Sequence, residues 1–250
     1  MADKELRTVP KISVRIWRPI IKKLDAKLEA ACIRRDAYLR KVLEIEVGCL
    51  ENEVSIPNSQ AAYDYIAATL DKFDRKLVSL ALPTELTSRI NEVCARKRIV
   101  RDAFFNRLFL LLAAAPKLID QLMFNGIDME NWRTEVWIEY KHDGPFFQNV
   151  FYPLESTIDP LLPIRWGIDI ANKDVEFEDY VEPTSGKKIE VGRELTGDPR
   201  PRDSLYTTIF DQKAGDSNLA GMNCYMADWQ IPGHGAAIEH EKKLDEMLGF

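Results

Sequence analysis

The sequence predicts an α+β protein of two parts: an N-terminal tandem repeat of strand-helix-helix units and a separate, mixed α+β C-terminal part. Three observations predict this class. Residues 12–47 align without a gap with residues 78–113, which lie 66 positions later. Both segments open on alternating apolar residues and continue with apolar residues at helical spacing. From Trp132 onward, short alternating segments, hairpin signals and loops replace this pattern.

Each repeat is predicted to begin with a strand. The apolar residues of the first strand alternate with polar ones and are Ile12, Val14 and Ile16. They align with Val78, Leu80 and Leu82 of the second. One short strand followed by two helices cannot bury its own apolar face, so we expect strands 12–17 and 77–82 to pair antiparallel. Thr84 is the predicted N-cap of the helix that follows the second strand.

Two helices are predicted after each strand. The first has apolar residues at positions 20, 24 and 28, which align with 86, 90 and 94. The second begins in "RRDAYLRKVL" and in its near copy "VRDAFFNRLF". Only five of the 36 aligned positions are identical, so the similarity rests on the spacing of apolar residues more than on sequence identity. The identical pairs are Ser13/Ser79, Ile33/Ile99, Arg35/Arg101, Asp36/Asp102 and Ala37/Ala103.

These patterns divide the chain into three stretches. Residues 1–117 hold the repeats (11–47 and 76–113) and a helical connector at 48–75, and residues 118–131 are predicted to be a linker helix. Residues 132–250 are expected to form the separate α+β domain. Its predicted elements are strands at 134–143 and 164–170, a hairpin at 176–191 and a helix at 235–248.

Charge differs sharply between the two parts. Residues 1–117 hold 22 Lys and Arg against 15 Asp and Glu, a net charge of +7. Residues 118–250 hold 12 against 25, a net charge of −13. This asymmetry suggests that a basic module binds a polyanion and that the acidic part has another role.

Several classes of protein are not expected. The chain has no apolar run of 18 residues and its first residues lack the apolar core of a secretory signal, so a cytoplasmic protein without membrane contact is expected. Its four cysteines are far apart and without a CxxC pair, which argues against a zinc ribbon or a disulfide framework. No metal-ligand spacing or catalytic motif is found, so we expect no enzyme, cofactor or metal.

The repeated unit resembles the ribbon-helix-helix superfamily of bacterial and phage repressors and antitoxins, in which two protomers contribute one strand each. Here the two protomers would be fused as an intramolecular pseudo-dimer over residues 10–47 and 76–113. The resemblance implies that the two-stranded ribbon enters the DNA major groove and that its outward side chains contact base edges. On the first strand these are Lys11, Ser13 and Arg15.

The second strand departs from this pattern. Its outward residues are Leu77, Ser79 and Ala81. Leu77 and Ala81 could contact thymine methyl groups. Alternatively, the C-terminal domain or a second chain covers them. Lys76 is expected to contact a phosphate.

The resemblance also implies a phosphate clamp at the N-terminus of the second helix of each unit. The matching turns carry Arg34 and Arg35 in the first unit, and Arg98 and Arg101 in the second. Asp36 and Asp102 are expected to cap these helices, or to form local charge pairs with Arg35 and Arg101.

Two functions follow as hypotheses. The first is a sequence-specific regulator that binds double-stranded DNA as a homo-oligomer. The alternative is an antitoxin-like interaction module whose acidic C-terminal domain sequesters a toxin or effector protein.

Overall fold

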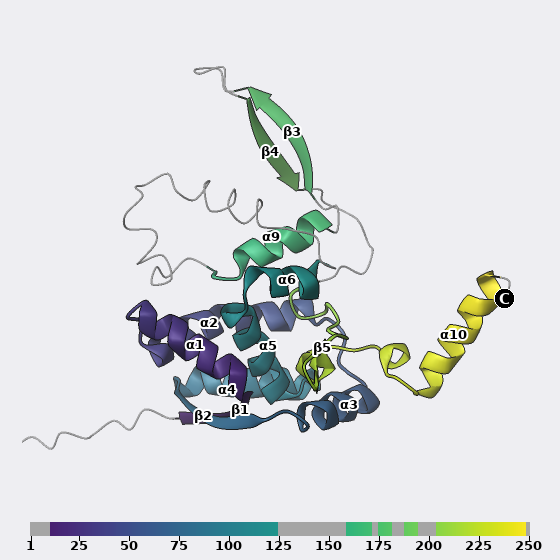
Figure 1. Cartoon of the computed structure of the whole chain (residues 1–250), viewed down its shortest axis with the longest axis horizontal. Helices are drawn as coiled ribbons and strands as arrows, with labels where there is room; N and C mark the ends of the chain where they lie inside the picture. The colour runs from purple at the N-terminus through teal and green to yellow at the C-terminus, as the bar shows by residue number, and fades with distance from the viewer. Residues whose placement is uncertain (1–10, 125–158, 172–174, 182–187, 195–203, 249–250) are drawn as a thin grey trace, which may run out of the picture.

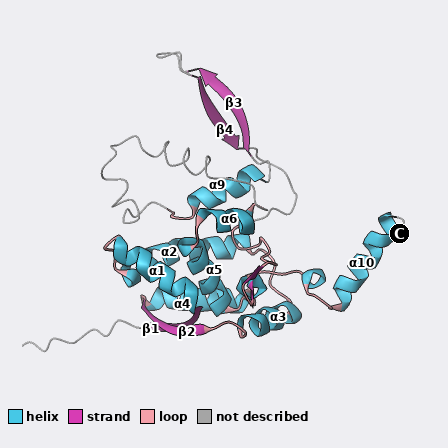
Figure 2. Cartoon of the chain, viewed as in Figure 1, coloured by secondary structure: helices cyan, strands magenta, loops and turns pink. Residues whose placement is uncertain are grey.

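The computed structural model describes residues 11–124, 159–171, 175–181, 188–194 and 204–248 (Figure 1). Over these residues the protein is mixed α+β and mostly helical, with a small two-stranded antiparallel sheet near the N-terminus (Figure 2). No helix in this part is both long and apolar enough to cross a bilayer. The strand predicted at 134–143 lies outside the described residues.

The N-terminal part contains one element order twice. The first unit consists of β1 (Lys11–Trp17), α1 (Arg18–Ala30) and α2 (Arg35–Glu53). The second consists of β2 (Arg75–Ala81), α4 (Thr84–Arg96) and α5 (Arg101–Ala113). Between them lies α3 (Gln60–Leu70), the helix predicted in the connector. The predicted helices and strands of both repeats are therefore confirmed.

The strands β1 and β2 pair antiparallel, as predicted, and form a two-stranded ribbon. Ser13 lies directly opposite Ser79, its equivalent 66 positions later. The local two-fold axis that relates the units therefore passes through this pair. The apolar residues at alternate positions of both strands are buried against the helices, which fixes the phase of the ribbon, and Lys76 near the start of β2 is the exposed exception.

The four helices of the two units enclose one core. Helix α1 contacts α5, and α2 contacts α4. Since α1 corresponds to α4 in the repeat, and α2 to α5, these two contacts are equivalent. Phe104, Phe105 and Phe109 of α5 are fully buried in this core. Phe105 makes edge-on ring contacts with the other two, at centroid distances of 5.3 and 6.1 Å.

The turn between the two helices has the same geometry in both units. Cys32 and Arg98, which are 66 positions apart, both have left-handed backbone conformations, with φ of 56° and 49°. After each of them an amide closes the turn: Ile33 N donates to Leu28 O and Ile99 N to Cys94 O, both at 2.8 Å. This is the pattern of a Schellman C-cap, and it aims the second helix of each unit in the same way relative to its strand.

The expected N-cap at Thr84 is wrong. Pro83 occupies the cap position and Thr84 is the first residue of α4, without a side-chain capping bond. Pro83 has the non-helical backbone of a cap residue, with φ of −55° and ψ of 146°, so Thr84 is already inside the helix and its hydroxyl is one residue past the cap position.

The C-terminal part confirms some predictions and corrects one. A helix α6 (Pro116–Met123) follows α5, the hairpin of β3 (Val175–Val181) and β4 (Lys188–Glu194) forms, and α10 (Gly235–Leu248) is the last described element. The strand expected at 164–170 is wrong, because these residues lie in helix α9 (Leu162–Ala171). Leu161, Ile164 and Ile168 are buried at helical spacing.

A separate C-terminal domain is not confirmed. Residues 204–231, which we call the strap, share one hydrophobic core with the two units. The strap contains β5 (Lys213–Ala214), β6 (Ser217–Asn218), and two short 3₁₀ helices, η2 (Leu219–Met222) and η3 (Asp228–Gln230). Element η2 contacts both α3 and α5. Figure 1 shows β5 beside these helices, whereas β3, β4 and α10 extend from the body of the molecule.

Candidate nucleic-acid interface

The outward face of the ribbon carries the predicted reading residues. Lys11, Ser13 and Arg15 are exposed on the face of β1 that points away from the helices. On β2, the same face consists of Leu77, Ser79 and Ala81. The backbone of the ribbon thus presents six side chains on one surface, with the two serines at its centre.

The register makes this face one-sided. Lys11 lies opposite Ala81, and Arg15 lies opposite Leu77, so the basic row on β1 faces an apolar row on β2. Leu77 is 63% exposed, so the described part of the chain leaves it uncovered. Lys76 is also exposed, but it lies opposite the buried Ile16 and belongs to the other face of the strand.

Side chains of α2 and α5 form hydrogen bonds with backbone groups at both edges of the ribbon. On the β1 edge, Asn106 of α5 accepts from Trp17 N at 2.7 Å and donates to Arg15 O at 2.9 Å. Arg101 donates to Ser13 O on the same edge at 3.1 Å. On the β2 edge, Asp36 of α2 accepts from Ala81 N at 3.2 Å. These bonds satisfy edge groups of both strands and fix the helix N-termini beside the ribbon.

The N-termini of α2 and α5 lack side-chain caps. The cap positions are Arg34 and Val100, and neither makes a side-chain capping bond. The expected capping by Asp36 and Asp102 is therefore wrong. Asp36 instead accepts from the edge of β2, as described above, and Asp102 lies 3.8 Å from Arg75 Nη1. The first amides of both helices carry the positive end of the helix dipole.

The two arginines that begin these helices have different partners. Arg35 contacts two carboxylates, Asp25 at 3.2 Å and Asp36 at 3.4 Å. Arg101 contacts Asn91, the repeat equivalent of Asp25, at 3.3 Å. A neutral amide thus replaces a carboxylate in the second unit, and the positive charge of Arg101 is not paired within the described residues.

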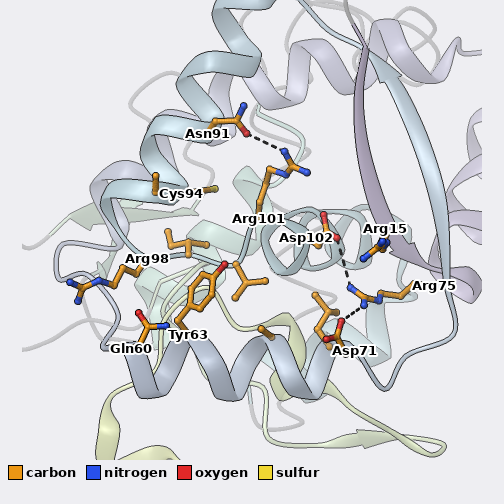
Figure 3. Close-up of a pocket in the computed structure, with 15 residues that line it drawn as sticks. Arg15, Gln60, Tyr63, Asp71, Arg75, Asn91, Cys94, Arg98, Arg101 and Asp102 are labelled. Atoms are coloured by element: carbon orange, nitrogen blue, oxygen red, sulfur yellow. Dashed lines mark hydrogen bonds and ion pairs between the residues drawn. The ribbon is translucent and has the colours of Figure 1, made fainter.

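A cleft of about 610 Å³ lies at the N-terminus of α5 (Figure 3). Three of the predicted site residues meet in it: Arg15, Arg98 and Arg101. Helix α3 forms its opposite wall, from which Tyr63 points toward the α4–α5 turn. The thiol of Cys94 also lines the cleft, and burial raises its pKa to about 12, so it is neutral there. Arg34 and Arg35 lie at the other helix N-terminus, outside this cleft.

Sequence reasoning did not find several residues of this region. They are Asn58, Tyr63, Arg75 and Asn106. Asn58 connects the strap to the α4–α5 turn, because its side chain donates to Arg98 O and Cys224 O and accepts from Met226 N. No local pattern identifies such a residue, since its partners lie 40 to 168 positions away.

A second polar cluster lies inside the protein. Arg165 of α9 contacts Glu46 at 2.7 Å and Asp159 at 2.9 Å, and it also pairs with Glu53. The hydroxyl of Tyr206 donates to Glu46, which is fully buried. Burial raises the pKa of Glu46 to about 7, although the charge of Arg165 opposes this. Within the described residues, no group of His, Cys, Asp and Glu is arranged to hold a metal ion.

Comparison with known proteins found no matching family model, no similar curated protein and no similar solved structure.

Proposed function

We propose that the protein is a sequence-specific, DNA-binding regulator of transcription whose two units form a tandem ribbon-helix-helix module. The observation that carries this proposal is the exposed row of Lys11, Ser13 and Arg15 on a paired antiparallel ribbon. The major groove of B-DNA is wide enough to admit such a ribbon.

The residue types of the ribbon suit contact with bases. Lysine and arginine donate to the O6 and N7 atoms of guanine, and serine accepts or donates to several bases. The buried phase of the strands supports this role, because it keeps the three side chains on one surface. Leu77, which is exposed opposite Arg15, suits the methyl group of thymine.

The helix N-termini supply phosphate contacts in this proposal. Uncapped amides and the helix dipole favour an anion at the starts of α2 and α5. Arg34 and Arg35 lie at the first of these sites, and Arg98 and Arg101 at the second. Such contacts position the ribbon without reading sequence.

One module covers one half-site, so we expect two or more chains on each operator. The acidic C-terminal part is proposed to mediate this assembly or to bind a partner.

The test is a gel-shift titration of the full chain on the DNA upstream of its own gene, with Arg15→Ala as the variant. Loss of a bidentate base contact should weaken specific binding by about tenfold to a hundredfold and leave binding to unrelated DNA much less affected. Lys117→Ala is the matched control, because Lys117 is an exposed cation on α6, on the opposite side of the molecule from the ribbon (Figure 1).

Two results would contradict the proposal. One is the absence of any complex at low salt with the wild-type chain. The other is equal weakening by Arg15→Ala and Lys117→Ala, which would mean that only total charge matters.

A salt series separates the phosphate contacts from the base contacts. The logarithm of the binding constant falls by about 0.9 per phosphate contact for each unit of the logarithm of salt concentration. Arg101→Ala should therefore reduce this slope by about 1 on every DNA sequence. A slope unchanged in the variant would remove Arg101 from the proposed interface.

A second candidate is a protein-binding role of the antitoxin kind. It is favoured by two exposed apolar side chains near the end of the chain, Trp229 and Ile238, which are 49% and 46% exposed. Co-purification of the chain with the product of a neighbouring gene, at a fixed stoichiometry that Trp229→Ala abolishes, would support this candidate.

A further inference from the structure

The cleft at the N-terminus of α5 is larger than a contact with the DNA backbone requires. Its volume of about 610 Å³ lies in the range of small-molecule sites, whereas a single phosphate fills only a corner of it. The cleft extends from Arg15 on the ribbon to Gln60 and Tyr63 at the start of α3. Most of its wall therefore lies away from the reading face.

The charge of the cleft favours an anion. Four arginines line it against two carboxylates; the lining charges are Arg15, Arg75, Arg98, Arg101, Asp71 and Asp102. Both carboxylates face Arg75, which pairs with Asp71 and lies 3.8 Å from Asp102 (Figure 3). Within the described residues, the other three arginines have no carboxylate partner; Arg98 and Arg101 donate only to neutral oxygens.

The first unit provides a comparison within the same molecule. At the equivalent helix N-terminus, Asp25 and Glu29 stand where the cleft has Asn91 and Ala95. Cys32 stands where the cleft has Arg98, and Ala81 where it has Arg15. Arg15 and the α4–α5 wall of the cleft together have a net charge of +2, whereas the equivalent positions of the first unit have a net charge of −1. The positive cleft is therefore specific to one unit and is not a by-product of the repeat.

Helix α3 adds a planar group to this site. Tyr63 is half-buried, and Figure 3 shows its ring pointing from α3 toward the start of α5, where Arg101 lies. An aromatic ring beside unpaired guanidinium groups suits a ligand that carries both a phosphate and a planar ring. Guanidinium binds phosphate through two parallel hydrogen bonds, and the tyrosine ring packs against a base.

We infer that this cleft binds a small phosphorylated ligand with a planar organic group, of the class of nucleoside monophosphates. Arg98 and Arg101 bind the phosphate, and Tyr63 contacts the ring. The cleft shares Arg98 and Arg101 with the proposed DNA phosphate contact, but binding of the small ligand requires no DNA, so the two proposals can be tested separately.

The experiment is isothermal titration calorimetry of the full chain, without DNA, against each common nucleoside monophosphate. The matching nucleosides and inorganic phosphate serve as separate probes. At least one monophosphate should bind at least about tenfold more tightly than its nucleoside and than inorganic phosphate. If none of the monophosphates binds, or if a nucleoside binds as tightly as its monophosphate, the inference fails.

The test variant gives the cleft the charges of the other unit. Asn91→Asp with Ala95→Glu changes two exposed positions of α4 and should weaken binding of the monophosphate by about tenfold or more. The matched control is Glu44→Gln, which changes an exposed charge on α2 outside the cleft and should leave binding unchanged. Circular dichroism checks that all variants are folded. Equal affinity of the double variant and the wild type would overturn the assignment.

Tyr63→Leu separates a free ligand from a phosphate of the DNA backbone. It should weaken binding of the monophosphate but leave binding of inorganic phosphate and of duplex DNA unchanged, since Tyr63 lies outside the proposed DNA interface. A loss of duplex binding in Tyr63→Leu would instead place backbone DNA in the cleft and overturn the small-ligand assignment. Failure of the gel shift alone would contradict only the DNA-binding proposal.

Discussion

Glu46 is a carboxylate without contact to solvent. It accepts from Arg165 and Tyr206 through one oxygen, and its other oxygen has no hydrogen-bond partner in the described part of the chain. The charge of Asp159 also acts on it, and Glu53 lies in the same cluster as a partner of Arg165. Three carboxylates therefore share one arginine, and burial favours the neutral form of Glu46 at pH values below about 7.

The free energy of unfolding therefore depends on pH through Glu46. The pKa of Glu46 rises from an ordinary 4.5 to about 7 in the folded chain. Between these values the folded chain holds a proton that the unfolded chain has released, so the free energy of unfolding decreases as pH rises through this window. The loss is on the order of 3 kcal/mol. In urea titrations at pH 5 and pH 8, Glu46→Gln should match the wild type at pH 5 and exceed its stability at pH 8.

Glu44→Gln is the control for this effect, because Glu44 is an exposed carboxylate on the same helix. An equal difference between Glu46→Gln and wild type at both pH values would contradict the raised pKa of Glu46.

Gly221 permits a close contact between η2 and α3. A Cβ atom there would lie 2.6 Å from Leu70 N and 2.8 Å from Leu70 Cα, which are backbone atoms that cannot rotate away. Gly221→Ala should therefore lower the free energy of unfolding by about 1–3 kcal/mol. Thermal unfolding measures the effect.

Gly48→Ala is an informative comparison, since Gly48 lies inside α2 and a Cβ atom there would meet only the tip of Arg89, at 3.4 Å. It should raise the stability by up to about 1 kcal/mol through helix propensity. If both alanines had the same effect, the contact with Leu70 would not limit the size of residue 221.

At the scale of the elements, the turn after α1 stores backbone strain. Cys32 has φ of 56°, a conformation that glycine adopts at no steric cost. Cys32→Gly should raise the free energy of unfolding by about 0.5–1 kcal/mol in urea titration. Ala31→Gly, one residue earlier with φ of −88°, should give no gain. A destabilised Cys32→Gly variant would contradict the strain at this turn.

The elements of the two units were predictable from the sequence because their burial is periodic. Alternation at positions 12, 14 and 16, and helical spacing after it, report directly which face is buried. The same local rule failed at 164–170. A short apolar run there fits both the strand period and the helix period, and packing against the core favours the helix.

The candidate interface was predictable only in part. The exposed positions of the ribbon follow from the phase of the strand, so the exposure of Lys11, Ser13 and Arg15 could be predicted. The cleft could not be predicted. Its α3 wall and the hydrogen bonds of Asn106 to β1 depend on contacts between residues 40 to 91 positions apart in the chain. Local patterns contain no information on such contacts.

At the scale of the whole molecule, the strap completes the core. Arg107 of α5 is fully buried and donates to Leu205 O at 2.7 Å, to Thr208 O at 2.8 Å and to Asn223 Oδ1 at 3.3 Å. Its guanidinium also lies 3.8 Å from the centre of the Phe210 ring. Burial lowers the pKa of Arg107, because it disfavours the charged guanidinium. The carbonyl groups of the strap offset this cost by accepting hydrogen bonds from the guanidinium.

A chain shortened to residues 1–124 should therefore be much less stable than the full chain. Arg107 and Asn58 lose their strap partners, and each buried polar group left without a partner costs about 1–3 kcal/mol. Differential scanning calorimetry should show a large decrease in Tm or no cooperative transition. An unchanged Tm would mean that the N-terminal part folds independently of the strap.

The pairing of Ser13 with Ser79 has a consequence for how the molecule can vary. When two identical chains form a symmetric ribbon, each mutation changes both halves at once, and the two faces must stay alike. In this protein the halves occupy different stretches of one gene, so a mutation changes one strand and leaves the other intact. One half is thus free to keep Lys11 and Arg15 while the other acquires Leu77 and Ala81, so the two faces of a two-fold ribbon can come to differ.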